Sequence, residues 1–201
     1  MNKLIFTMSL IFSLNSFAQE NKYEPVANKA EYYAVKYLPG KNYMDFRNWV
    51  MENQEKVLNK TDVYDNFDIA LFQPQFGTDL TQFDAVFLGL WPNATEMFSG
   101  MEYWVKNGGE QNAKVPVKTV QAVDTWQWAV SEPEGDPDIG VVRFSDCKMK
   151  DGVNANQVFD ALKDFAIAAK ETGDNLGRKM IFPGSGGTEG DYDYVYSPVS
   201  Y

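Results

Sequence analysis

Apolar and polar residues alternate with a period of two along several short runs of the chain, which predicts β-strands. These runs cover residues 32–38, 68–76, 82–91, 119–130, 139–144, 178–183 and 191–199. In 82–91 both alternating sets are apolar, so both faces of that strand need to be covered. Helices cover one face of a sheet, and we expect a second sheet on the other.

Between these strands the apolar positions follow a helical period. The first helix has an apolar face made of Phe46, Trp49, Val50, Val57 and Leu58. The second begins after Asn93, with Glu96 completing a capping box, and its apolar face consists of Ala94, Met97, Phe98, Met101, Trp104 and Val105. The third follows the capping pattern Asn154-x-x-Gln157.

The chain aligns with itself at an offset of 109 residues without a gap. The identical pairs include Pro74 with Pro183, Gly77 with Gly186 and Asp84 with Asp193. We interpret this register as an internal duplication. The first copy reads β-α-β-β-α-β, the ferredoxin-like order, and the second reads β-α-β-β.

The predicted organisation begins with a secretory signal at 1–18: a basic start, an apolar run and a small-x-small cleavage site. An N-terminal lead at 19–30, a first repeat at 31–130, an acidic linker at 131–138 and a second repeat at 139–201 follow. The second repeat lacks the last helix and strand. Either the chain is truncated, which we favour because an open sheet edge is unfavourable, or another molecule completes the unit.

Composition excludes several kinds of chemistry. The sequence contains no histidine, which removes histidine-based triads, histidine-ligated zinc and haem held by a proximal histidine. We therefore expect neither a metal nor a cofactor. The net charge of −10 disfavours nucleic acid and membrane surfaces as partners. Cys147, the one cysteine, is expected to be a buried residue rather than a nucleophile.

Candidate site residues lie on the strand at 119–130, where Asp124, Trp126 and Trp128 share one side. This side is the best predicted pocket wall, and Asp124 is the candidate for a catalytic base. Lys36 and Arg143 would bind the acidic end of an apolar ligand if their side of the strands faces the interior of the barrel. The alternative is that the two tryptophans are core residues and the two cations reach solvent.

Two further motifs are interpreted as structural. The run "PGSGGTEG" at 183–190 resembles a phosphate-binding loop, but it has no Lys-Ser/Thr ending and does not lead into a helix, so we expect a hairpin turn. Asp84 and Asp193 could form a paired-carboxylate site, but carboxylates at hairpin starts are more often bound to backbone N–H groups.

The chain resembles the dimeric α/β-barrel superfamily in the β-α-β-β-α-β order of 32–130, its partial copy at 139–201 and the hairpins around Asp84 and Asp193. It looks most similar to the NIPSNAP-like and antibiotic-biosynthesis-monooxygenase-like groups. The resemblance implies an α+β fold: a tandem ferredoxin-like βαββαβ repeat whose sheets pack face to face as a barrel-like pseudo-dimer. The superfamily also includes haem-binding chlorite dismutases, whose proximal histidine has no match here.

Three functions follow as hypotheses. The first is an exported, secreted or periplasmic protein that binds a small apolar or aromatic molecule in the barrel, with a homodimer as one expected assembly. The second is a cofactor-independent oxygenase or isomerase with Asp124 or a tyrosine as base. The third is a non-catalytic interaction scaffold.

Overall fold

The computed structural model describes residues 21–77, 79–135, 139–187 and 190–201 of the chain. The predicted secretory signal at 1–18 and three residues of the predicted linker, 136–138, lie outside these ranges. None of the described helices is long and apolar enough to cross a membrane.

The first repeat contains four strands and its helices in the order β-α-β-β-α-β. Its elements are β1 (Ala27–Tyr37), α1 (Tyr43–Lys56), two short 3₁₀ turns (Leu58–Lys60 and Asp62–Tyr64), β2 (Asp68–Phe72), β3 (Ala85–Trp91), α2 (Ala94–Asn107), α3 (Gly109–Asn112) and β4 (Val117–Ser131). Asn42 begins α1 with a capping box to Asp45, and the Asn93 side chain accepts from the Glu96 N–H at the start of α2.

The second repeat has the order β-β-α-β-β, because two short strands take the place of its first strand. Its elements are β5 (Val141–Val142), β6 (Ser145–Cys147), α4 (Ala155–Glu171), β7 (Gly177–Pro183) and β8 (Tyr194–Ser200). Asn154 and Gln157 form the predicted capping box of α4.

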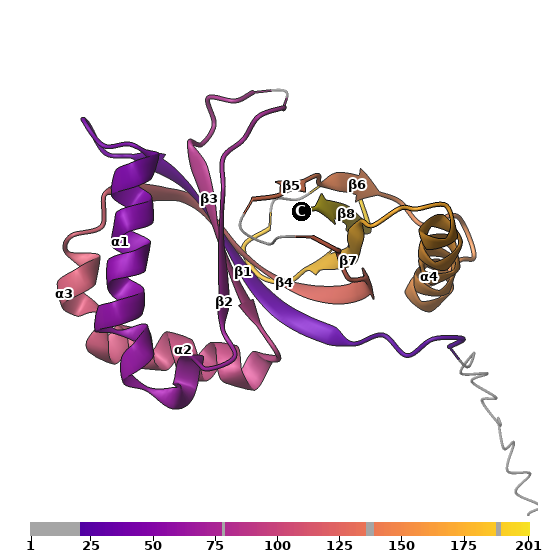
Figure 1. The fold of residues 1–201 in the computed structure, drawn as a ribbon, viewed down its shortest axis with the longest axis horizontal. Coiled ribbons are helices and arrows are strands. Elements are labelled where there is room, and N and C mark those ends of the chain that lie inside the picture. The colour runs from indigo at the N-terminus through magenta and orange to yellow at the C-terminus, as the bar shows by residue number, and fades with distance from the viewer. Residues whose placement is uncertain (1–20, 78, 136–138, 188–189) are drawn as a thin grey trace, which may run out of the picture.

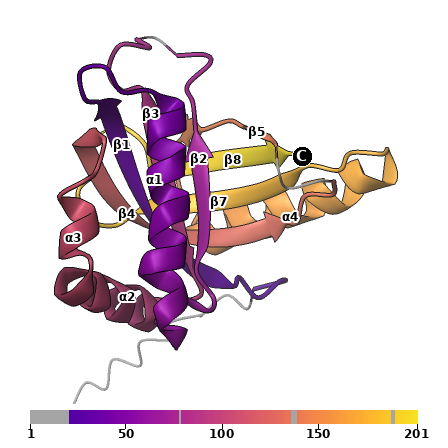
Figure 2. The same ribbon diagram turned by 60° about the vertical axis from the view of Figure 1, so that its left-hand side comes forward.

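The described strands form one antiparallel sheet in the order β2-β3-β1-β4-β7-β8-β5, and β6 also pairs with β8. The sheet curls, so that the strands of the two repeats face and cross one another, with α1 and α2 outside one repeat and α4 outside the other (Figures 1 and 2). Aromatic side chains bridge the interior: the Phe144 ring lies 6.0 Å from Tyr32 and 6.3 Å from Phe72. This is the predicted tandem ferredoxin-like pseudo-dimer.

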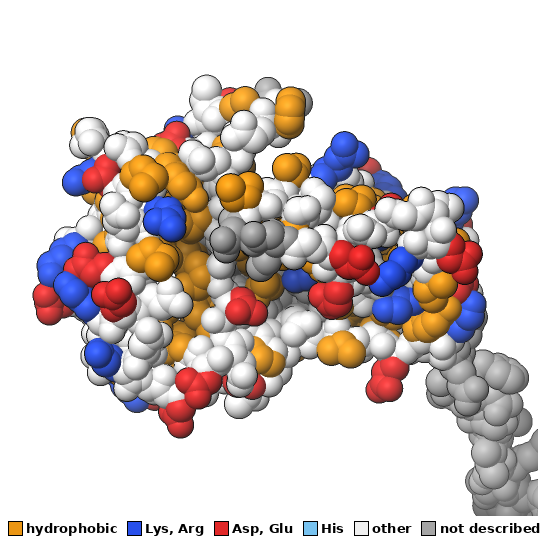
Figure 3. All heavy atoms as spheres, in the orientation of Figure 1, with side chains coloured by type: hydrophobic (Ala, Val, Ile, Leu, Met, Phe, Trp, Pro, Cys, Tyr) orange, Lys and Arg blue, Asp and Glu red, His pale blue; other side chains and the backbone are white. Residues whose placement is uncertain are grey.

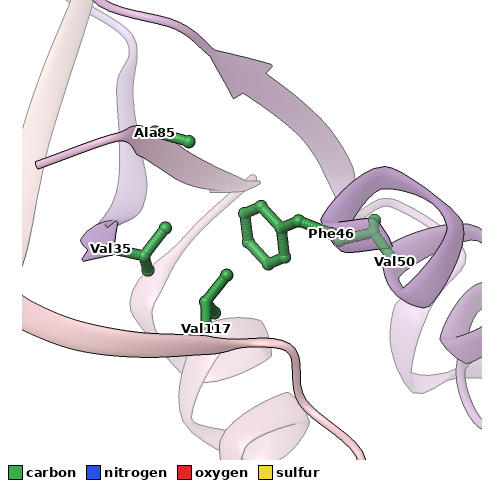
Figure 4. Packing of buried hydrophobic residues seen from close by; sticks show 5 residues of the cluster. All are labelled: Val35, Phe46, Val50, Ala85 and Val117. Carbon is green, nitrogen blue, oxygen red and sulfur yellow. The ribbon is translucent and has the colours of Figure 1, made fainter. Parts of the chain in front are cut away.

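The core of the first repeat lies between α1 and the sheet. Phe46 points from α1 toward Val35, Ala85 and Val117 of the sheet (Figure 4), and Val50 belongs to the same buried cluster. Burying side chains of this size contributes about 1.5–3 kcal/mol each. The second repeat buries Phe159 of α4 in the same way, against the β4 and β7 strands.

The structure corrects the expected strand at 139–144. The chain forms two short strands there, and Phe144 lies between them. The gapless register is the cause of the error. β2 with β7 and β3 with β8 keep the offset of 109 residues, whereas the first strand of each repeat does not: the Asp84 N–H donates to the Val35 carbonyl and the Asp193 N–H donates to the Cys147 carbonyl, an offset of 112.

Candidate functional site

A cavity of about 450 Å³ lies between α1, α2 and the face of the first-repeat sheet that these helices cover. Its size is typical of a site for a small molecule. Apolar side chains gather along a hollow beside α1 (Figure 3). The aromatic residues that line the cavity are Tyr33, Phe46, Trp49, Tyr64, Phe67, Phe87, Trp91 and Trp104.

Two glycines allow Trp91 to lie flat in the wall of this cavity. The Trp91 ring stacks on Phe67 with 4.1 Å between ring centroids. A Cβ at Gly100 would lie 2.1 Å from the Trp91 ring, and a Cβ at Gly89 would lie 2.7 Å from the Phe67 ring. The close approach of α2 to the sheet therefore depends on residues without side chains.

Glu31 places a half-buried carboxyl group at the cavity wall. Its oxygens accept hydrogen bonds from the Tyr33 hydroxyl at 2.8 Å and from the Trp91 indole N–H at 3.1 Å. Burial raises the pKa of the Glu31 carboxyl above its usual range, and the two hydrogen bonds only partly oppose this effect. The site thus holds a carboxyl group that takes up a proton more readily than one in water.

The two tyrosines beside Glu31 act as hydrogen-bond donors. Burial and the neighbouring Glu31 raise the pKa of Tyr33, and the same causes raise the pKa of Tyr64 to about 12. The Tyr64 hydroxyl donates to the Gly100 carbonyl at 2.6 Å. Both phenols are therefore protonated at neutral pH.

The contacts of Asp124 indicate a structural role rather than a catalytic one. Its carboxylate forms an ion pair with the buried Lys29 at 2.8 Å and accepts a hydrogen bond from the Ser185 N–H. Burial raises the pKa of Asp124, but the Lys29 and Ser185 hydrogen bonds and the Lys29 charge outweigh it, so the pKa lies below its usual value. A carboxylate held ionised in this way is a poor proton acceptor at neutral pH.

Trp126 and Trp128 lie on the same face of β4 as Asp124, but Lys36 is not on that face. The Lys29 ammonium lies 4.7 Å from the Trp126 ring centroid, and Trp128 packs edge-to-face on Phe159 under α4. Both tryptophans therefore lie on the helix-covered face of the sheet, whereas Lys36 lies on the opposite face and is exposed. Arg143 is exposed in the second repeat.

The glycine-rich run packs against β4. The Gly184 N–H donates to the Asp124 carbonyl, and the Asp124 N–H donates to the Ser185 carbonyl. A Cβ at Gly184 would lie 2.0 Å from an Asp124 carboxylate oxygen, and Gly186 has a φ of +79°. The described residues of this run thus connect β7 and β8 as a structural turn.

Asp84 and Asp193 are bound to backbone N–H groups, as predicted. Asp84 accepts from the Tyr37 N–H at 2.8 Å, and Asp193 accepts from the Met149 N–H at 2.7 Å. Cys147, expected to be buried, is half-buried.

Sequence reasoning missed Glu31 and Asn53, which line the cavity. The position of each residue in the sequence pattern could have indicated its role. Glu31 is in phase with Tyr33 and Val35 on the strand, and Asn53 is in phase with Phe46 and Val50 on the helix. A polar residue on an otherwise apolar face is the informative exception to burial rules.

Comparisons with known proteins show the fold. No protein-family model matches the chain, and no curated protein matches its sequence. Two mutant chlorite dismutases from Candidatus Nitrospira defluvii are similar in structure. One has a TM-score of 0.50 and 7% identity over 90% of this chain and 79% of its own. The other has a TM-score of 0.50 and 8% identity over 88% and 78%.

The residues at the cavity do not fit a haem of the kind that the superfamily resemblance implies. The chain has no histidine to serve as the proximal ligand. The oxygens of Glu31, Tyr33 and Tyr64 are engaged in the hydrogen bonds given above. In the described ranges no group of three or more Cys, Asp or Glu residues is arranged to hold a metal ion.

Proposed function

We propose that the protein binds a small, neutral and largely aromatic molecule in the cavity between α1, α2 and the sheet. The observation that carries the proposal is the lining: three tryptophans and several other rings surround a space of about 450 Å³. Aromatic walls favour flat apolar ligands through burial and ring stacking. The proposed site lies on the helix side of the sheet, not in the barrel interior that the sequence suggested.

The charges of the residues that line the cavity favour a neutral ligand. No lysine or arginine is among the residues that line the cavity, whereas Glu31 is. An anion would enter an apolar space beside a carboxyl group without a cation to pair with.

A second candidate function is a cofactor-independent oxygenase or isomerase, in line with the resemblance to the antibiotic-biosynthesis-monooxygenase-like group. The raised pKa of Glu31 favours it, because a general base works best with a pKa near the operating pH. On this hypothesis the Glu31 carboxylate removes the acidic proton of an activated ring. Proton–deuterium exchange at the acidic carbon of anthrone, accelerated by the wild type but not by Glu31→Gln, would support it. Equal rates in both would exclude it.

The binding proposal is tested with Prodan, a neutral naphthalene dye whose emission shifts to the blue when it leaves water. We expect saturable binding to the wild type and weakened binding to Val115→Phe, because Val115 lines the cavity. Val120→Phe is the matched control, since Val120 is exposed and does not line it. Equal binding to all three proteins would contradict the proposed location.

We also propose that the protein is exported. The basic, apolar and small-x-small pattern of residues 1–18 supports this proposal. N-terminal sequencing of the mature protein is expected to begin at Gln19, and an intact Met1 would contradict it.

A further inference from the structure

Asn53 carries a buried amide that has no hydrogen-bond partner among the described residues. Its side chain is on α1, lines the cavity and is 4% exposed. Neither its Nδ2 nor its Oδ1 atom forms a hydrogen bond within the described ranges of the chain. Leaving a buried polar group unpaired is unfavourable, so such a group in a cavity wall is a feature that needs an explanation.

The neighbouring polar groups of the cavity have partners. The Trp49 indole N–H donates to the Gln111 carbonyl at 3.0 Å. Glu31 accepts two hydrogen bonds, and Tyr64 donates one. Asn53 differs from these three residues, because neither atom of its amide has a partner among the described residues.

The helix places Asn53 on its inward face. Asn53 follows Phe46 by seven residues and Val50 by three, so it shares their inward face. Both of those residues are buried in the core of the first repeat. The Asn53 amide thus lies on the apolar side of the helix, among the residues that line the cavity.

We propose that Asn53 recognises a carboxamide-type group on the ligand, a carbonyl next to an N–H, as in a primary amide or a lactam. This inference rests on the proposed function of the same cavity and adds the class of ligand. The Asn53 Nδ2–H group donates to the ligand carbonyl, and the ligand N–H donates to Oδ1. A carboxamide edge is the small neutral group that satisfies both atoms with two parallel bonds. The aromatic walls hold the rest of the molecule.

The test uses three naphthalenes of the same shape and the variant Asn53→Leu. 2-Naphthamide has a donor and an acceptor, 2-acetylnaphthalene has an acceptor, and 2-isopropenylnaphthalene has neither. Calorimetric titration measures their affinities. Asn48→Leu is the matched control, because Asn48 lies on the exposed side of the same helix.

We expect wild type and Asn48→Leu to bind 2-naphthamide about tenfold or more tightly than 2-acetylnaphthalene, since the analogue leaves Oδ1 unpaired. In Asn53→Leu this preference disappears, whereas binding of 2-isopropenylnaphthalene is kept or improved, which also shows that the variant is folded. A preference that persists in Asn53→Leu, or equal affinities in the wild type, would overturn the inference while the proposed function stands. If none of the three probes binds the wild type, the proposed function fails as well.

Discussion

At the scale of single residues, Glu31 connects the stability of the fold with the chemistry of the cavity. Its carboxyl group is held by Tyr33 and by the indole of Trp91, which is 2% exposed. Burial disfavours the ionised form, so the folded state binds the Glu31 proton more tightly than the unfolded chain does. This difference makes the contribution of Glu31 to stability depend on pH.

We predict that Glu31→Gln removes this pH dependence. Because the folded pKa is raised above the ordinary value of 4.5, the contribution of Glu31 is fully present below pH 4.5 and is lost as the pH rises through the folded pKa. The variant should therefore gain stability relative to the wild type as the pH rises through that range. Urea unfolding from pH 4 to pH 8 measures the difference.

Glu55→Gln, on the exposed side of α1, is the control for this measurement. A stability difference between Glu31→Gln and the wild type that stays constant over the pH range would contradict the assigned pKa direction. The Gln side chain can keep both contacts, with its carbonyl accepting from Trp91 and its amide donating to Tyr33.

Sequence reasoning found the residues whose roles depend on the local backbone and missed those whose roles depend on packing. The binding of Asp84 and Asp193 to backbone N–H groups was predictable from their places at hairpin starts. The role of Asp124 was not, because Lys29 lies 95 residues away in the sequence. Glu31 and Asn53 required knowledge of which faces of β1 and α1 meet.

At the scale of elements, the duplication is visible as an aspartate anchor, a hydrogen bond between an aspartate and a backbone N–H that recurs in both repeats. In each repeat an aspartate before the third strand accepts from a backbone N–H at the end of the first strand. The capping residues Asn42, Asn93 and Asn154 begin the long helices. These features are encoded locally, which is why most elements were predicted within a few residues.

The two aspartate anchors should differ in strength. Asp84 is half-buried and Asp193 is exposed, so water competes less for Asp84. We predict that Asp84→Ala lowers the free energy of unfolding by about 1.5–3 kcal/mol and that Asp193→Ala causes a smaller loss. Chemical denaturation of the two variants measures this, and a larger loss for Asp193→Ala would refute the assignment.

The glycine-rich turn gives a second test at this scale. Gly184→Ala should destabilise the protein by about 1–3 kcal/mol, because the new Cβ would collide with the Asp124 carboxylate and disturb its ion pair with Lys29. At Gly187 a new Cβ would lie 3.6 Å from Pro183, an ordinary contact. Gly187→Ala should therefore change the stability by less than about 0.5 kcal/mol. Equal losses in thermal unfolding would mean that the turn does not pack as described.

The broken strand at 141–147 shows where local patterns were not sufficient. Alternation predicted a continuous strand at 139–144, but pairing with β8 places Cys147 where the first repeat has Val35. Long-range hydrogen bonds between the strands set the register. Aligning the sequence with itself at one constant offset does not reveal them.

At the scale of the whole molecule, the curled sheet places its helices outside and the two repeats face to face (Figure 1). The α+β class and the tandem repeat were predictable from the order of elements. The location of the cavity was not, because it depends on how far α1 and α2 stand from the sheet. Lys36 was expected in one pocket with Trp126, but strand pairing puts the two side chains on opposite faces. The homodimer stays a prediction.

The central claim is that an aromatic molecule binds on the helix side of the first repeat. A crystal structure of the protein with 2-naphthamide tests it most directly. We predict density for the naphthalene ring between Trp91 and Trp104, with the carboxamide on Asn53. Density in the barrel interior beside Tyr32 and Phe144, with the helix-side cavity empty, would contradict the account.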